Sequence, residues 1–174
     1  MLLDPRFRGL SSLKLVGNSW MSNCKALQSP TFIGLENLLT IKSKWMAGCN
    51  MLQNPMFYGL EKLGCVLDDW MSGCPMLLEP RFLGLSSLDN VGNNWMARCI
   101  ILRNPVFHGL ENLRIVGKHW MSECRMIHFL EPLFVCLSSL EEVGGYRIEK
   151  GDDISRLPIW SRNPHERWTY ELSE

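Results

Sequence analysis

The cysteines are the residues whose spacing first points to possible chemistry. Seven are present, and five of them recur at intervals of 25 residues: Cys24, Cys49, Cys74, Cys99 and Cys124. A zinc site needs four converging ligands, usually supplied by C-x₂₋₄-C pairs, and the sequence has no such pair. Parallel side chains in a single column also give poor disulfide geometry. We therefore expect buried, reduced thiols that pack as small apolar groups, an arrangement that fits a reducing compartment.

Tryptophan recurs with the same interval, and each copy is followed by Met. The five positions are Trp20, Trp45, Trp70, Trp95 and Trp120. A column of indole rings can serve as a stacking platform for sugars or nucleic-acid bases. The alternative is a ladder of core side chains. Strict recurrence favours the core ladder, because the residues of a binding surface usually vary.

The other reactive side chains form no recognisable catalytic or metal-binding set. His108 and His119 lie in one repeat, but no Ser, Cys or carboxylate completes a nucleophile and base arrangement around them. The pairs Asp68-Asp69 and Asp152-Asp153 are interpreted as solvated loop carboxylates rather than a cation site. The sequence thus predicts no enzyme, no cofactor and no metal. An enzyme with its site in residues 144–174 is a third, poorly supported class.

Composition limits the class of partner. Of the 174 residues, 18 are basic and 18 are acidic, so net charge gives no argument for nucleic acid or an anionic membrane. The longest apolar runs are far shorter than the roughly 20 residues that span a bilayer. The first ten residues resemble no signal peptide, and Asn-x-Ser/Thr sites are absent. We expect a protein partner, no membrane segment and, by a small margin, an intracellular location; oligomeric state stays undetermined.

The elements that position these columns come from an internal repeat. The shared frame is x-L-x-x-P-x-F-x-G-L-x-x-L-x-x-[VI]-x-x-x-W-M-x-x-C-x. Five copies follow one another without a gap, at 1–25, 26–50, 51–75, 76–100 and 101–125. A degenerate sixth copy occupies 126–150, with its pattern shifted by two residues, and completes a solenoid over 1–150. Residues 151–174 fall outside the period and are interpreted as a C-terminal cap or a tail.

Each repeat is expected to form one coil with one short strand. Proline donates no backbone hydrogen bond, so it must precede a strand or lie outside it. The strands predicted on this basis are 6–8, 31–33, 56–58, 81–83 and 106–108. Val16, Trp20 and Cys24 are spaced i, i+4, i+8, which indicates a short helical turn with Trp, Met and Cys on its inward face.

Two segments of the frame resemble a known family. L-x-x-P-x-F-x-G-L, as in residues 27–35, is similar to the core of leucine-rich repeats, and residues 91–102 resemble the I-G-x-x-[AF]-[FL]-x-x-C-x-x-L segment of BspA-like repeats. Such repeats occur in bacterial surface antigens and in protist proteins. The resemblance implies a right-handed superhelix with short parallel strands on one face and short helical turns on the other. Here Pro replaces a usual Leu, and the Asn-ladder position is displaced or replaced.

The residues that vary inside the fixed frame are the best candidates for recognition. They lie at two alternate positions of each predicted strand, so that each position lines up across the sheet. The set is Arg6, Arg8, Thr31, Ile33, Met56, Tyr58, Arg81, Leu83, Val106 and His108. The leading hypothesis is a protein-interaction module that binds through this face. The alternative is a structural or surface-adhesion array that forms part of a longer protein, with ordinary surface variation at these positions.

Overall fold

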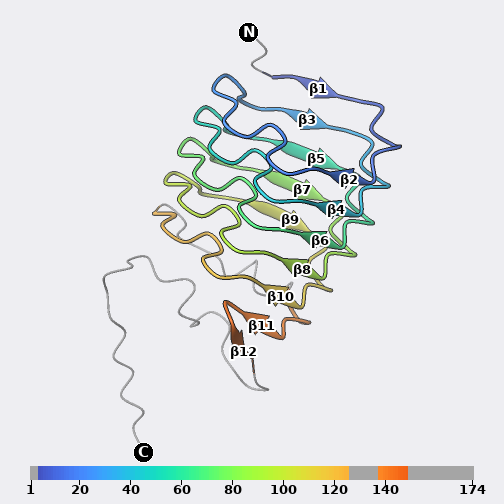
Figure 1. Cartoon of the computed structure of the whole chain (residues 1–174), viewed down its shortest axis with the longest axis vertical. Coiled ribbons are helices and arrows are strands. Elements are labelled where there is room, and N and C mark those ends of the chain that lie inside the picture. Colours follow the sequence, from blue (N-terminus) through green and yellow to red (C-terminus); the bar gives the residue numbers. More distant parts are fainter. Residues whose placement is uncertain (1–3, 126–136, 149–174) are drawn as a thin grey trace, which may run out of the picture.

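The computed structural model describes residues 4–125 and 137–148, and in them the chain winds into a β-solenoid of about five turns. Each turn takes about 25 residues, and successive turns stack along one axis (Figure 1). The predicted repeat boundaries at 126–150, and the cap or tail at 151–174, lie largely outside the described residues.

The strands predicted after each Pro are present and form a five-stranded parallel sheet, here called sheet A. Its strands are β1 (Arg6–Phe7), β3 (Thr31–Phe32), β5 (Met56–Tyr58), β7 (Arg81–Leu83) and β9 (Val106–His108), adjacent in that order. Residues 25 apart are paired, as with Phe7 and Phe32. Pro5 precedes its strand and uses its carbonyl, which accepts the Thr31 amide at 2.9 Å. The predicted position of each strand is therefore confirmed, although β1 and β3 end one residue early because strand pairing there stops at Phe7 and Phe32.

A second sheet, here called sheet B, was missed by the sequence reasoning. It contains β2 (Leu15–Val16), β4 (Thr40–Ile41), β6 (Cys65–Val66), β8 (Asn90–Val91), β10 (Ile115–Val116), β11 (Glu142–Val143) and β12 (Tyr146–Arg147). The available signal was the invariant Val or Ile at the second strand position, since β-branched residues favour strands. Strands therefore lie on two sides of the solenoid, and the expectation of strands on one face alone was wrong.

The predicted helical turn around Trp-Met is also wrong, and no helix is present in the described part of the chain. The backbone there alternates in the sign of φ, which is positive at Lys44, Met46 and Gly48. A helix needs consecutive residues with negative φ. The alternation instead directs amides to neighbouring coils, as in the 3.0 Å bond from the Met46 amide to the Trp20 carbonyl. The expected inward placement of Trp, Met and Cys is nevertheless confirmed, because Trp45, Met46 and Cys49 are fully buried.

One position of the repeat at which φ is positive allows a stability prediction. Two successive coils have glycine there, Gly48 and Gly73, whereas the next coil has the exposed Arg98, at φ 60°. A side chain in the left-handed region costs roughly 1–2 kcal/mol, partly offset by the greater freedom of unfolded glycine. Arg98→Gly should raise the free energy of unfolding by about 0.5–1 kcal/mol in urea titration. The reverse change Gly73→Ala, which meets no atom within 4 Å, should lower it by a similar amount; movement of both variants in one direction would contradict this explanation.

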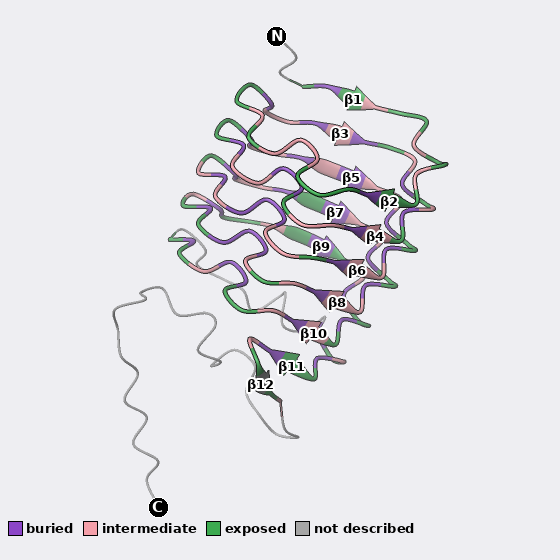
Figure 2. Ribbon diagram, in the orientation of Figure 1, coloured by how far each residue is buried: buried purple, intermediate pink, exposed green. Residues whose placement is uncertain are grey.

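The core is a set of side-chain ladders between the two sheets. Phe rings of successive coils stack at 5.1–5.2 Å from Phe32 to Phe107, and Trp rings stack at 5.3–5.6 Å from Trp20 to Trp120. Each Phe also meets a Trp edge on, as with Phe82 and Trp70 at 5.0 Å. Trp45, Trp70, Trp95 and Trp120 are fully buried, so the interpretation of this column as core is confirmed. Figure 2 shows buried segments that recur in successive coils.

The degenerate sixth copy ends sheet B with a hairpin. Val143 pairs with Val116, 27 residues earlier, which confirms the shift of two residues. The chain then reverses through Gly144 and Gly145, both at positive φ, as a type I′ turn requires, and β12 pairs antiparallel with β11. The antiparallel strand β12 therefore occupies the place beside β11 that the next parallel strand of the solenoid would take.

Candidate functional site

The cysteine column is part of the core. All six cysteines of the described chain are free, and Cys49, Cys74 and Cys99 are fully buried. From Cys49 to Cys124, each ladder thiol donates to the Met carbonyl of the preceding coil, as from Cys74 Sγ to the Met46 carbonyl at 3.1 Å. Burial raises the pKa of Cys99 well above that of a free thiol. Cys74 and Cys99 both donate a hydrogen bond and have a raised pKa, which makes these two thiols poor nucleophiles and poor metal ligands.

The two partly exposed cysteines should react differently from the ladder. Cys24 lies at the first coil and Cys65 on the outer side of sheet B, and both are only partly buried. We expect maleimide to label Cys24 and Cys65 in the folded protein, while Cys74, Cys99 and Cys124 react only after unfolding. Mass spectrometry of the labelled peptides measures this directly. Equal labelling rates for Cys65 and Cys99 would show that the thiol column is not packed as described.

The Asp68-Asp69 pair bonds to the next coil. Asp68 Oδ1 accepts the Asn93 amide at 2.7 Å, and Asp69 Oδ1 accepts Asn94 Nδ2 at 3.0 Å. The same contact recurs one coil later, where Asn93 Oδ1 accepts the Lys118 amide. Side chains at this repeat position therefore form a ladder of hydrogen bonds between coils. Within residues 4–125 and 137–148, no group of three or more His, Cys, Asp or Glu side chains is placed to hold a metal ion.

Charged side chains gather on the outer side of sheet B toward its C-terminal end. Arg114 bonds to both carboxylate oxygens of Glu141, at 3.0 and 2.9 Å, and lies 3.5 Å from Asp89. The Arg114 guanidinium lowers the pKa of Glu141, chiefly through these hydrogen bonds. The groups are exposed, and solvent screens such pairs. We interpret this cluster as a link between coils rather than as a site.

The outer side of sheet A carries the predicted recognition residues. Inward positions are always Phe, and the flanking positions project outward, since alternate strand residues face opposite sides. Arg6, Thr31, Met56, Arg81 and Val106 are aligned by strand pairing, and so are Tyr58, Leu83 and His108. The strand register therefore aligns these residues on one face, as expected.

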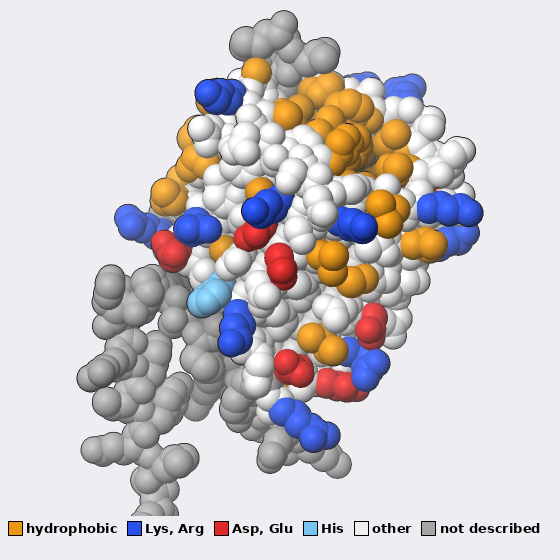
Figure 3. Space-filling model, viewed as in Figure 1, with side chains coloured by type: hydrophobic (Ala, Val, Ile, Leu, Met, Phe, Trp, Pro, Cys, Tyr) orange, Lys and Arg blue, Asp and Glu red, His pale blue; other side chains and the backbone are white. Residues whose placement is uncertain are grey.

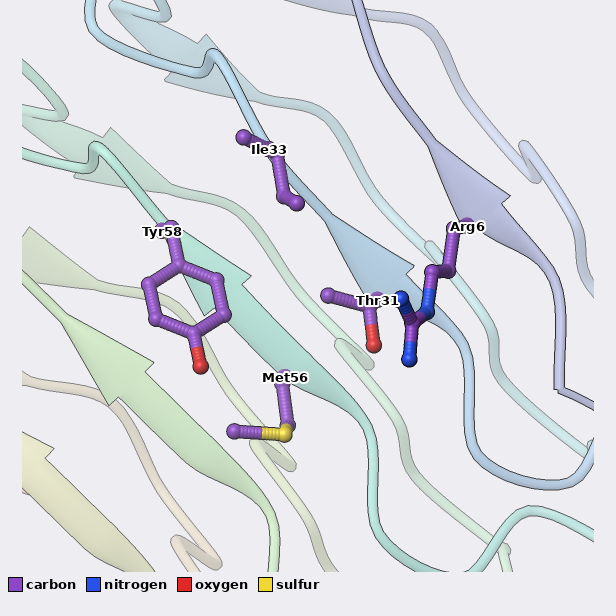
Figure 4. A pocket seen from close by; sticks show the side chains of 5 residues that line it. All are labelled: Arg6, Thr31, Ile33, Met56 and Tyr58. Carbon is purple, nitrogen blue, oxygen red and sulfur yellow. The ribbon is translucent and has the colours of Figure 1, made fainter.

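Five of these residues line one shallow hollow of about 350 Å³. They are Arg6, Thr31, Ile33, Met56 and Tyr58, from β1, the β3 segment and β5 (Figure 4). In this view the guanidinium of Arg6 lies beside Thr31, while Ile33, Met56 and the Tyr58 ring surround the hollow. The hollow combines apolar walls with the guanidinium of Arg6 and the hydroxyls of Thr31 and Tyr58. Such a surface suits an apolar side chain next to a carboxylate.

The other predicted residues lie outside the hollow. Arg81 and Leu83 on β7, and Val106 and His108 on β9, continue the same face toward the C-terminal coils. Arg8 is exposed just after β1 and does not line the hollow. The structure therefore divides the predicted set between a hollow at the first three strands and a flatter surface beyond.

The sequence did not lead us to predict one group of exposed apolar residues, which lies in or next to the strands of sheet B. Leu15 and Leu39 are each 48% exposed and Leu67 is 39% exposed. Leu39 and Leu67 could have been found from the sequence, because their positions are polar or glycine in the other regular coils.

Comparison with protein-family models, with curated proteins and with solved structures finds no match to this chain. Among the described residues, no helix is long and apolar enough to cross a bilayer.

Proposed function

We propose that this chain is a protein-interaction module without catalytic activity, and that it binds its partner through the outer side of sheet A. The observation that carries the proposal is the hollow, because it gathers five side chains that vary within an otherwise fixed frame. The outward strand positions differ from coil to coil, whereas the inward position next to them is always Phe. We interpret the varying positions as the recognition surface and the invariant Phe as the packing that supports it. Two of the three strands beneath the hollow, β3 and β5, are paired on both sides, which holds their outward side chains in place.

The relation to leucine-rich repeats belongs to the same proposal. We infer that the repeat is a variant of the leucine-rich, BspA-like kind, from its spacing and from the buried Leu residues that follow each sheet A strand, such as Leu35 and Leu38. The second strand in each coil distinguishes this variant from the pattern that the resemblance implies. Proteins built from such repeats commonly present the short-strand face to partners, which agrees with the face chosen here.

An experiment with a matched control tests the proposed face. The triple variant Ile33→Ser/Met56→Ser/Tyr58→Ser removes the apolar walls of the hollow without touching the core. The control Leu39→Ser/Leu67→Ser removes comparable exposed apolar surface from sheet B. We expect cross-linking capture from the source cell to lose its partner with the triple variant and to keep it with the control.

The opposite pattern would assign binding to sheet B and end the proposal for sheet A. Full partner recovery by both variants would favour the structural or adhesion array instead. Circular dichroism of each variant verifies that its solenoid is intact.

A further inference from the structure

The outward positions of sheet A carry charge of one sign. Arg occurs in or directly after its strands at Arg6, Arg8 and Arg81, and none of the described strands of this sheet contains a carboxylate. The chain as a whole has equal numbers of basic and acidic residues. Figure 3 shows Asp and Glu interspersed with Lys and Arg over much of the face that it draws. The excess of Arg is therefore a local property of the outer side of sheet A.

Arg6 and Arg81 are exposed, and neither forms an ion pair with another described residue. The ion pairs in that part of the chain both belong to Arg114. Glu79 lies two residues before Arg81, but its Oε1 accepts a hydrogen bond from Asn104 Nδ2 at 3.3 Å. Both guanidiniums are thus available to carboxylates of another molecule.

The register of the strands sets the distance between these two residues. Arg6 and Arg81 lie in one row, and β3 and β5 lie between their strands. Neighbouring strands are about 4.8 Å apart, so the two Cα atoms are separated by about 14 Å. The surface between them is the hollow, with Ile33, Met56 and the ring of Tyr58 (Figure 4). A complementary ligand therefore has two negative charges about 14 Å apart and apolar groups between them.

The strands along this surface offer side chains but no unpaired strand edge. β3, β5 and β7 are each paired on both sides. A segment that lies across them receives no strand hydrogen bonds, so a conformation that pairs its own amides and carbonyls is favoured. One turn of an α-helix advances about 5.4 Å, close to the strand spacing of about 4.8 Å. Side chains of successive helix turns therefore meet successive strands.

Helix geometry gives the positions of the contacting residues. Positions i, i+4, i+7 and i+11 lie along one face of an α-helix. The first and the last are about 16 Å apart, which the long, flexible side chains of Arg6 and Arg81 can match. The two positions between them then lie over the hollow.

From these observations we propose that the outer side of sheet A binds an amphipathic helix of a partner protein, which lies across the strands. Apolar residues at i+4 and i+7 lie over the hollow, and carboxylates at i and i+11 bind Arg6 and Arg81. The inference deepens the proposed function, on which it rests for the partner being a protein and for the face that is used. It adds the conformation and the charge pattern of the bound segment.

Stapled peptides test the spacing of the charges on the full chain. The probe is a fluorescent 14-residue peptide that a hydrocarbon staple on its outer side holds helical, with Glu at i and i+11, Leu at i+4 and i+7, and Ala or Gln elsewhere. Its control has the same composition, but the second Glu is moved to i+9, on the opposite side of the helix. Fluorescence anisotropy should show about fivefold or tighter binding of the probe, an advantage that falls as salt rises.

Reversal of charge tests the contacts with Arg6 and Arg81. The variant Arg6→Glu/Arg81→Glu should bind a peptide with Lys at i and i+11 more tightly than the Glu probe, because each contact then joins opposite charges. Arg98→Glu is the control, since Arg98 is exposed and outside both sheets, and Glu123 holds the same position in the next coil. This control should keep the preference for the Glu probe.

A further peptide tests the helical conformation. It has no staple and has Pro at two outer positions, so it keeps the four contact residues but cannot form the helix. It should bind at least about tenfold more weakly than the stapled probe. Circular dichroism verifies the conformation of each peptide and the intact fold of each protein variant.

Equal binding of the probe and its shifted control, or of the probe and the Pro peptide, would overturn the proposal. If no peptide binds while the hollow variant still abolishes partner capture, the helix proposal fails and the sheet A function stands. If the peptides bind as expected but capture survives the hollow variant, the helix site stands and the sheet A function fails.

Discussion

Replacing Trp70 by Ala should lower the free energy of unfolding by about 3–5 kcal/mol, as large-to-small changes of buried aromatic residues do. Trp70 is fully buried and stacks on Trp45 and Trp95 at 5.4 and 5.3 Å. Its edge also meets Phe57 and Phe82. Loss of this one ring therefore opens a cavity that touches three coils, and equilibrium unfolding in urea measures the cost.

Two variants show whether stacking is the cause. In the described part of the chain the Trp70 indole N–H is buried without a hydrogen-bond partner, so Trp70→Phe keeps a ring and removes an unsatisfied donor. We expect its loss to be about 1 kcal/mol or less. Trp20→Ala should cost about half as much as Trp70→Ala, because Trp20 is partly exposed and, among the described residues, stacks on one Trp ring rather than two. A Trp70→Phe loss equal to that of Trp70→Ala would assign the stability to the indole edge rather than to the stack.

Replacing Gly109 by Ala should cost about 2–4 kcal/mol, because it combines backbone strain with a steric overlap. Gly109 has φ +97°, outside the ordinary left-handed region, and an added Cβ would lie 2.9 Å from the Ser86 amide nitrogen. That nitrogen belongs to the backbone of the preceding coil and cannot rotate away. The variant must therefore separate two coils next to β9, and thermal unfolding would record the change.

Gly9 provides the matched control, since it occupies the same repeat position in the first coil. Its φ is +72°, and an added Cβ would meet nothing within 4 Å. Gly9→Ala should then cost only the left-handed strain, about 1 kcal/mol. Similar losses for the two variants would mean that strain alone, rather than contact between coils, explains the invariance of this glycine.

These comparisons share one property of the fold. A residue in a middle coil is held by identical residues on both sides, whereas the same residue in the first coil is held on one side. Stability is then a sum of interfaces between neighbours, as expected for a solenoid. Within the described residues, the apolar side chains of the first coil are consequently less buried than their counterparts in the middle coils.

The sequence alone determined the period, the five coils, the strand after each Pro and the inward placement of Phe, Trp, Met and Cys. A strict interval of 25 is sufficient for this, because stacking places equivalent residues side by side whatever the local backbone. The shift of two residues in the sixth copy was likewise readable, and the pairing of Val116 with Val143 confirms it.

Only the tertiary structure decided the backbone conformation between the sheet A strand of one coil and that of the next. The spacing of Val16, Trp20 and Cys24 fits a helix, yet Val16 belongs to β2, and φ alternates in sign through the segment that follows. Both conformations bury the same side chains, so hydrophobic spacing cannot distinguish them; the deciding factor is that amides find partners in adjacent coils, which exist only after stacking. The hollow at Arg6 and Tyr58 depends on the same step, because residues of three different coils make it.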